Sequence, residues 1–114
     1  MNPEIKAAWV AALRSGEYSQ GRGRLRNDHA FCCLGVLCDL HRKAGLGEWR
    51  NTVYVPFGDI PESMQLPSAV DRWAGITNDR ITRGVLPAYN DGDIDNQIGE
   101  HSFGQIADYI EQHL

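Results

Sequence analysis

A run of ten residues, FCCLGVLCDL at positions 31–40, contains a single charged residue, Asp39. At helical spacing, one stripe is made of Leu34, Leu37, Cys38 and the following His41, and Val36 and Leu40 widen it. Arg42 and Lys43 suit the negative end of a helix dipole, and Gly45 is a typical helix stop. The sequence therefore predicts a helix over residues 33–44, buried through its first two turns at the centre of the fold.

Both ends of the chain carry helix signals. Asn2 is a capping residue, Pro3 suits the first helical position and Gly16 can end the helix. Ser102 and Gln105 have the spacing of a capping box at a second helix. Each helix has one apolar face: Ile5, Ala8, Trp9, Ala12 and Leu13 in the first, and Phe103, Ile106, Ile110 and Leu114 in the second. We expect both faces to pack into the core.

The segments between these helices predict β-structure. Residues 18–26 indicate a loop and a strand, a turn follows at Asn27–His29, and residues 30–32 return as a second strand. Residues 51–57 indicate a further strand, of edge character because of Pro56.

The remaining segment contains one short helix, which begins at Pro67 and ends at Gly75. Residues 76–90 fit either a strand or a helix. The length of 114 residues suits one domain, residues 1–114, with a single core. We predict an α+β fold in which a small antiparallel sheet packs on the central helix and the terminal helices.

The charge pattern limits the classes of partner. A net charge of −4 argues against nonspecific nucleic-acid binding, and no apolar run is long enough to span a membrane. Residues 14–50 hold seven Lys or Arg against four Asp or Glu, whereas residues 91–114 hold six acids and no Lys or Arg. We expect a cytoplasmic protein whose basic half and acidic tail pair within the chain or between copies in a homo-oligomer.

The sharpest candidate site is the segment QGRGRLR at residues 20–26. In an extended conformation Arg22, Arg24 and Arg26 share one face, about 6.6 Å apart, which is twice the rise of a strand. Such a row could hold phosphates, and Gln20 and Asn90 could then read the edges of a base or ribose. The alternative is an exposed edge strand that its charges protect from aggregation. The predicted ligand-binding residues are Tyr18, which would stack on a base, with Gln20, Arg22, Arg24, Arg26 and Asn90.

The three cysteines predict no metal site and no cofactor. Cys33 and Cys38 point about 140° apart on a helix, and no CxxC pair is present. A buried, reduced thiol is the ordinary state of such residues. A papain-like hydrolase is the competing hypothesis, with Cys32 or Cys33 as nucleophile beside Gln20 and His101.

The acidic run Asp91–Asp95 has the start of a calcium loop but not its end. Asn96 stands where the loop needs glycine, and Ser102 stands where it needs a bidentate glutamate. We therefore expect a solvated loop rather than a cation site.

Four stretches carry a resemblance that spans nearly the whole chain: residues 9–26, 31–40 and 66–76, and YNDG followed by HSFGQIADYIEQHL. The pattern W-x-x-A-L-R-S-G-x-Y-x-Q-G begins at Trp9, and C-C-L-G-V-L-C covers residues 32–38. The chain resembles small phage and actinobacterial accessory proteins. The resemblance implies an accessory protein of a mobile element and brings no catalytic residues.

These observations lead to one leading hypothesis of function. We expect a phage-type binding protein that is not an enzyme and that sequesters an anionic small ligand, such as a cyclic nucleotide of host defence. The alternatives are the cysteine hydrolase and a protein-interaction module whose basic face docks an acidic partner.

Overall fold

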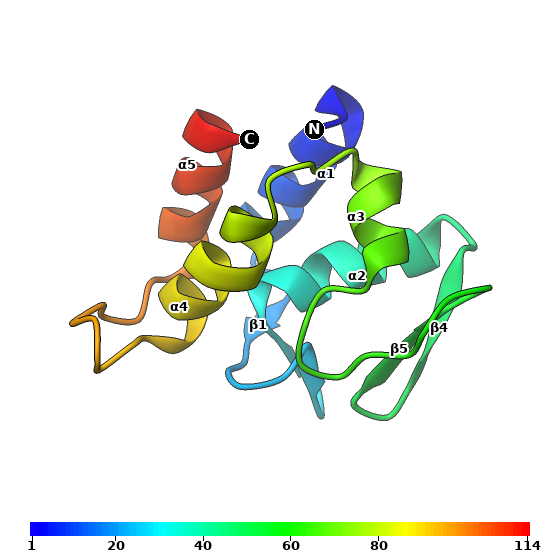
Figure 1. The fold of residues 1–114 in the computed structure, drawn as a ribbon, viewed down its shortest axis with the longest axis horizontal. Coiled ribbons are helices and arrows are strands. Elements are labelled where there is room, and N and C mark those ends of the chain that lie inside the picture. The colour runs from blue at the N-terminus through cyan, green and yellow to red at the C-terminus, as the bar shows by residue number, and fades with distance from the viewer.

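The computed structural model describes residues 1–114, which form five α-helices, a π-helical turn and five short strands (Figure 1). The helices are α1 (Pro3–Arg14), α2 (Cys33–Lys43), α3 (Ser68–Ala74), α4 (Leu86–Asp91) and α5 (Phe103–His113). The strands are β1 (Ser19–Gln20), β2 (Arg26–Asn27), β3 (Ala30–Phe31), β4 (Gly47–Arg50) and β5 (Val53–Pro56). The predicted α+β class is confirmed.

The predicted helix caps form as expected. The Asn2 side chain accepts hydrogen bonds from the first turn of α1, and both bonds of the Ser102–Gln105 capping box are present at α5. The buried face of α1 is made of Trp9, Val10 and Leu13, and it lies against α2 and α5. Ala8, which we expected on that face, is exposed.

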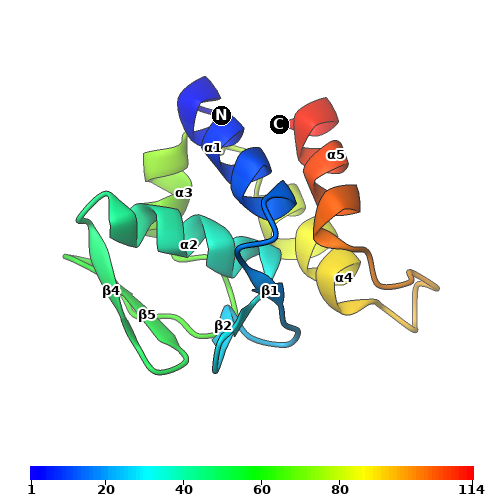
Figure 2. The same ribbon diagram turned by 180° about the vertical axis from the view of Figure 1, so that it is seen from behind.

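The central helix is confirmed with nearly the predicted bounds. Every residue of α2 from Cys33 to Asp39 is buried, as is His41. The Trp9 indole N–H donates to the Cys33 carbonyl at 2.9 Å, which satisfies a buried donor between α1 and α2. Figure 2 shows α1 and α5 side by side on one side of α2, with the two small sheets on the other. Twenty-one buried hydrophobic residues around α2 form one cluster.

The sheet prediction needs two corrections. There are two small sheets, and the first is mixed, because β1 pairs with β3 in parallel while β2 pairs with β3 antiparallel. The predicted strand over residues 20–26 is wrong, since the chain bends between β1 and β2, and Gly23 adopts φ +83°. Leu25 in this bend is fully buried. The chain therefore bends in a way that buries the Leu25 side chain, instead of continuing as an extended strand.

The second sheet is an antiparallel hairpin of β4 and β5, and the sequence did not indicate β4. In β5 the buried residues are Tyr54 and Pro56, whereas Val53 and Val55 are only partly covered. The segment left open between strand and helix is helical from Asp79 onward, whereas residues 76–78 form no regular element. It forms the π-helical turn Ile81–Val85, which continues directly into α4.

The longest helix has 12 residues, and none of the helices combines the length and apolar character needed for a membrane crossing. Three of the six acids in the tail, Glu100, Asp108 and Glu111, pair with arginines of the same chain. Arg14 on α1 bridges to Asp108 and Glu111 on α5, and Arg22 bridges to Glu100 at 2.9 Å. These ion pairs bring basic and acidic segments of the sequence together within one molecule.

Candidate functional site

The three predicted arginines do not form a single row. Arg22 is held by Glu100, and the Arg24 guanidinium lies 3.4 Å from the Thr52 hydroxyl. The Arg26 Nε donates to the carbonyl of Asp28 at 3.0 Å. The bend between β1 and β2 breaks the alternation on which the row depended, because period two holds only in an extended chain.

Gln20 and Asn90 meet, but their amides bond to the protein itself. Asn90 is 1% exposed, and its Oδ1 accepts from the Gln20 amide at 3.0 Å and from the Cys33 backbone N–H at 3.2 Å. Its Nδ2 donates to the Gly21 carbonyl and to Asp91, both at 2.8 Å. Gln20 donates a second bond, at 2.8 Å, to the carbonyl of His101. These contacts join four segments of the chain.

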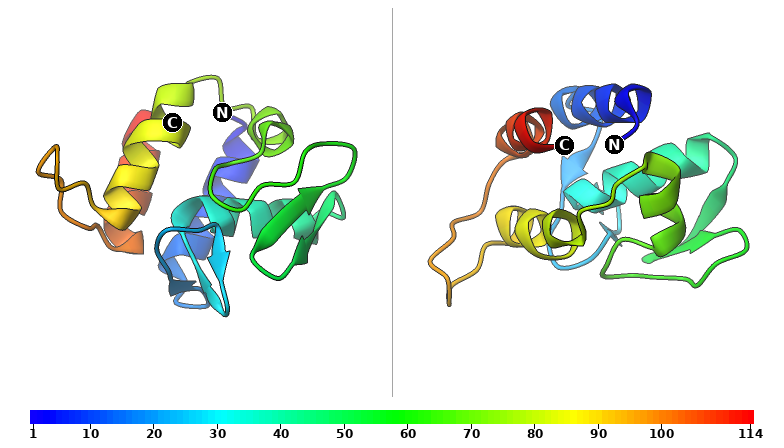
Figure 3. Two further views of the ribbon diagram at one scale, coloured as in Figure 1. Left: turned by 60° about the horizontal axis from the view of Figure 1, so that its bottom comes forward. Right: turned by 45° about the horizontal axis from the view of Figure 1, so that its top comes forward.

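Tyr18 and Arg26, in contrast, line a cleft of about 560 Å³ between the two small sheets. Figure 3 shows the hairpin β2–β3 and the hairpin β4–β5 side by side below α2. We call this hollow the aromatic cleft; its lining residues are Glu17, Tyr18, Arg26, Phe31, Asp39, Arg42, Lys43, Glu48 and Trp49.

Three aromatic rings form a continuous series in the aromatic cleft. The Tyr18 and Phe31 rings meet edge to face with centroids 5.1 Å apart, and the Phe31 and Trp49 rings meet at 5.8 Å. Edge-to-face packing is a favoured geometry for aromatic pairs and holds each ring in place. The three rings are therefore held in fixed positions along one side of the cleft.

Two cations lie against these rings without a carboxylate partner. The Arg26 guanidinium is 5.7 Å from the centroids of both Phe31 and Trp49, and the Lys43 ammonium is 5.4 Å from that of Tyr18. Neither cation takes part in a salt bridge, whereas Arg42 binds Asp39 and Arg50 binds Glu48. Cation–π contact orients Arg26 and Lys43 but leaves their positive charge available to an anion.

The buried carboxylate of Asp39 organises the cleft from α2. It accepts from the Tyr18 hydroxyl at 2.6 Å, from the Trp49 indole N–H at 3.0 Å and from the Arg42 Nε at 2.7 Å. Burial alone would raise the pKa of Asp39, but the hydrogen bonds from Arg42, Tyr18 and Trp49 outweigh it and lower that pKa below its usual value. Asp39 thus stays ionised and fixes two of the aromatic side chains.

The family model described as Domain of unknown function (DUF8296) matches residues 1–114. The chain belongs to this family. Comparisons with curated proteins and with solved structures returned no match. The match to the DUF8296 model includes every residue of the aromatic cleft, since it covers the whole chain.

In this DUF8296 chain, Asp39→Asn is expected to destabilise the fold by about 1.5–3 kcal/mol at pH 7, the range of hydrogen bonds to charged groups. Because the folded pKa of Asp39 is lowered, its contribution is complete above the unfolded pKa of about 3.9 and is lost as the pH falls through the folded value. Urea denaturation between pH 7 and pH 2.5 should show that the free energy of unfolding falls less with decreasing pH in the variant than in the wild-type protein. If it falls equally in the two proteins, this assignment is wrong.

The cysteines of the DUF8296 chain are all free and buried. Burial raises the pKa of Cys32 to about 11 and that of Cys33 well above its usual value, so both thiols stay protonated at neutral pH. The Cys33 thiol points to the Leu86 carbonyl, at 3.9 Å. The His101 ring stacks on Tyr89, and its Nδ1 bonds to the Gly99 carbonyl. These contacts occupy the groups that a hydrolase would use and argue against an activated nucleophile.

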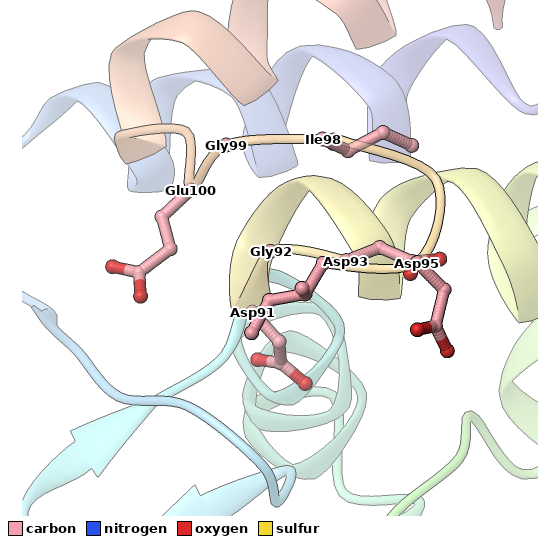
Figure 4. A pocket seen from close by; sticks show the side chains of 8 residues that line it. Asp91, Gly92, Asp93, Asp95, Ile98, Gly99 and Glu100 are labelled. Atoms are coloured by element: carbon pink, nitrogen blue, oxygen red, sulfur yellow. The ribbon is translucent and has the colours of Figure 1, made fainter.

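The acidic loop after α4 borders a hollow of about 880 Å³. Figure 4 shows that the carboxylates of Asp91, Asp95 and Glu100 point in different directions. Asp93 is engaged by Asn96, and no group of three or more possible metal ligands occurs in the chain. The loop therefore lacks the convergent oxygens that a calcium ion needs.

Sequence reasoning missed most residues of the aromatic cleft, namely Glu17, Phe31, Asp39, Arg42, Lys43, Glu48 and Trp49. One signal was available. Asp39 is the only charged residue in the apolar run at residues 31–40, and a buried carboxylate requires polar partners. Arg42 lies three residues further along the same helix, whereas Trp49 comes from β4 and Tyr18 from the segment before β1, so only the tertiary fold identifies these two partners.

Proposed function

We propose that this protein binds an anionic small ligand that carries a planar ring, with a nucleotide as the leading class, and holds it without chemical turnover. The observation that carries the proposal is the pair of cations, Arg26 and Lys43, set against the aromatic series without carboxylate partners. A base can pack on the rings while its phosphate reaches the cations.

Two observations favour this function over its alternatives. The hydrolase hypothesis needs an accessible thiolate, and Cys32 and Cys33 are buried with raised pKa values. Docking of an acidic protein needs a free basic face, but Arg14 and Arg22 are paired with the acidic tail. Three cations and three carboxylates line the aromatic cleft. Arg42 pairs with Asp39 and Glu48 pairs with Arg50, while Arg26, Lys43 and Glu17 form no salt bridge, so the unpaired charge is on the scale of a small ligand.

The biological setting of the proposal comes from the resemblance to phage accessory proteins. In that setting the protein acts in the cytosol of the host and sequesters a cyclic nucleotide that signals host defence. Binding without turnover suffices for this role, because a sponge removes the signal by mass action.

Calorimetry with adenosine and guanosine monophosphates, cyclic mononucleotides and cyclic dinucleotides tests the proposal. We expect at least one member of this panel to bind. The double variant Arg26→Gln/Lys43→Gln should weaken its binding by about 100-fold or more, since each of the two charge-assisted hydrogen bonds contributes about 1.5–3 kcal/mol and about 1.4 kcal/mol corresponds to tenfold.

The matched control is Arg72→Gln/Arg80→Gln, which removes the same charge from positions outside the cleft. It should leave the affinity within about twofold, because exposed charges at a distance are screened by salt. Circular dichroism would verify that both double variants fold. The absence of binding across the panel, or equal weakening in both double variants, would overturn the proposal.

A further inference from the structure

A second, smaller hollow adjoins the aromatic cleft. It has a volume of about 200 Å³, and none of its lining residues is hydrophobic. We call it the turn pocket; it is lined by Arg26, Asp28, His29, Asn51 and Thr52. Arg26 also lines the aromatic cleft, so one guanidinium borders both hollows.

The turn pocket lies between the tips of the two hairpins. The turn at Asp28–His29 joins β2 to β3, and the turn at Asn51–Thr52 joins β4 to β5. Asp28 and Asn51 have positive φ values of 60° and 56°, a conformation that Asp and Asn tolerate better than other non-glycine residues. The backbone of each tip is thereby set, and the polar side chains face a common hollow.

Arg24 does not line the turn pocket itself, but its guanidinium contacts Thr52, which does. Its Nη1 lies 3.4 Å from the Thr52 hydroxyl, and it forms no salt bridge. Together with Arg26 and the imidazole of His29, it supplies donors for an anionic group. The carboxylate of Asp28 opposes them, which leaves one net positive charge from Arg24, Arg26 and Asp28.

We infer that the turn pocket is a phosphoryl subsite, so that the preferred ligand is a nucleotide with at least two phosphoryl groups. This inference rests on the proposed function. The aromatic cleft takes the base, Arg26 binds the first phosphoryl group where the two hollows meet, and Arg24 and His29 bind the second. The polar lining of the turn pocket suits a phosphoryl group and gives no apolar surface for a second base.

Titration calorimetry with adenosine or guanosine mono- and diphosphates tests the subsite. The diphosphate should bind about tenfold more tightly than the monophosphate, because the second phosphoryl group gains charge-assisted hydrogen bonds. The double variant Arg24→Gln/His29→Gln should remove this difference and leave the monophosphate unchanged. The charge-matched control Arg80→Gln should preserve the difference in affinity between the diphosphate and the monophosphate.

Asp28→Asn provides a test by gain of affinity. Asparagine keeps the backbone conformation of the turn, while the loss of the opposing charge should strengthen diphosphate binding about threefold, as for an exposed charge pair. The monophosphate should respond less. An equal gain for both ligands would contradict a second phosphoryl group in the turn pocket.

The source of the second phosphoryl group is resolved by comparing the diphosphate with a 5′-phosphorylated linear dinucleotide of the same base. Either ligand binding more tightly than the monophosphate supports the subsite, and the tighter one identifies a polyphosphate tail or a second nucleotide as its source. Equal affinity of all three overturns the inference but leaves the proposed function standing. If none of them binds and the cyclic nucleotides also fail, the proposed function falls as well.

Discussion

Replacement of Gly35 by alanine is expected to lower the free energy of unfolding by about 3 kcal/mol or more, at the upper end of overpacking effects. Gly35 lies on α2 directly against the bend that carries Leu25. A Cβ at this position would lie 1.8 Å from the Leu25 carbonyl oxygen and 2.7 Å from its carbon. Backbone atoms cannot rotate away from the clash, so the bend or the helix must shift. Urea denaturation followed by circular dichroism measures the loss.

Gly104→Ala is the matched control on α5. The nearest atom to its added Cβ is the Ser102 hydroxyl oxygen, at 3.8 Å, so the methyl group makes an ordinary van der Waals contact and no clash. Because alanine is the better helix former, this variant should gain about 0.5–1 kcal/mol. Similar stabilities for Gly35→Ala and Gly104→Ala would show that the contact between α2 and the Leu25 carbonyl is looser than described.

Asn90→Ala is expected to cost about 2–4 kcal/mol, because it leaves several buried groups without a hydrogen-bond partner. The Cys33 backbone N–H and the Gly21 carbonyl both lose the amide that satisfies them. The Gln20 amide keeps only its bond to His101. Thermal and urea unfolding would quantify the loss, and amide hydrogen exchange at Cys33 should become faster.

Asn96→Ala is the control for Asn90→Ala. Asn96 is exposed and binds only the neighbouring Asp93, so its removal should change stability by less than about 0.5 kcal/mol. If Asn90→Ala were equally mild, Asn90 would be free to serve a ligand as the sequence predicted. A large loss supports its role in joining β1, α2 and α4.

The helices could be predicted because their signals are local. Asn2, Ser102 and Gln105 cap their helices as predicted, and the apolar run at residues 31–40 became the buried turns of α2. A cap needs only the next few residues, and helical periodicity needs only the chain itself. The exception on α1, where Val10 rather than Ala8 is buried, reflects packing against α5 and α2.

The candidate site was predicted only in part. Tyr18 and Arg26 line the aromatic cleft, whereas Gln20 and Asn90 bond to each other and to the backbone. The roles of Arg22 and Arg24 in ligand binding stay predictions. The alternation assumed for residues 20–26 failed because the fully buried Leu25 and the left-handed Gly23 bend the chain, and neither effect is visible in a period-two pattern.

The positions of the main helices, the α+β class and the separation of basic and acidic segments could be predicted from the sequence, since they depend on neighbouring residues and on composition. Which charges remain unpaired, in contrast, depends on the folded structure. Arg22 meets Glu100 across 78 positions of sequence, while Arg26 and Lys43 come to lie on aromatic rings from other elements. Ion pairing acts over a few ångströms of space, and which side chains share that space is set by the packing of the whole chain.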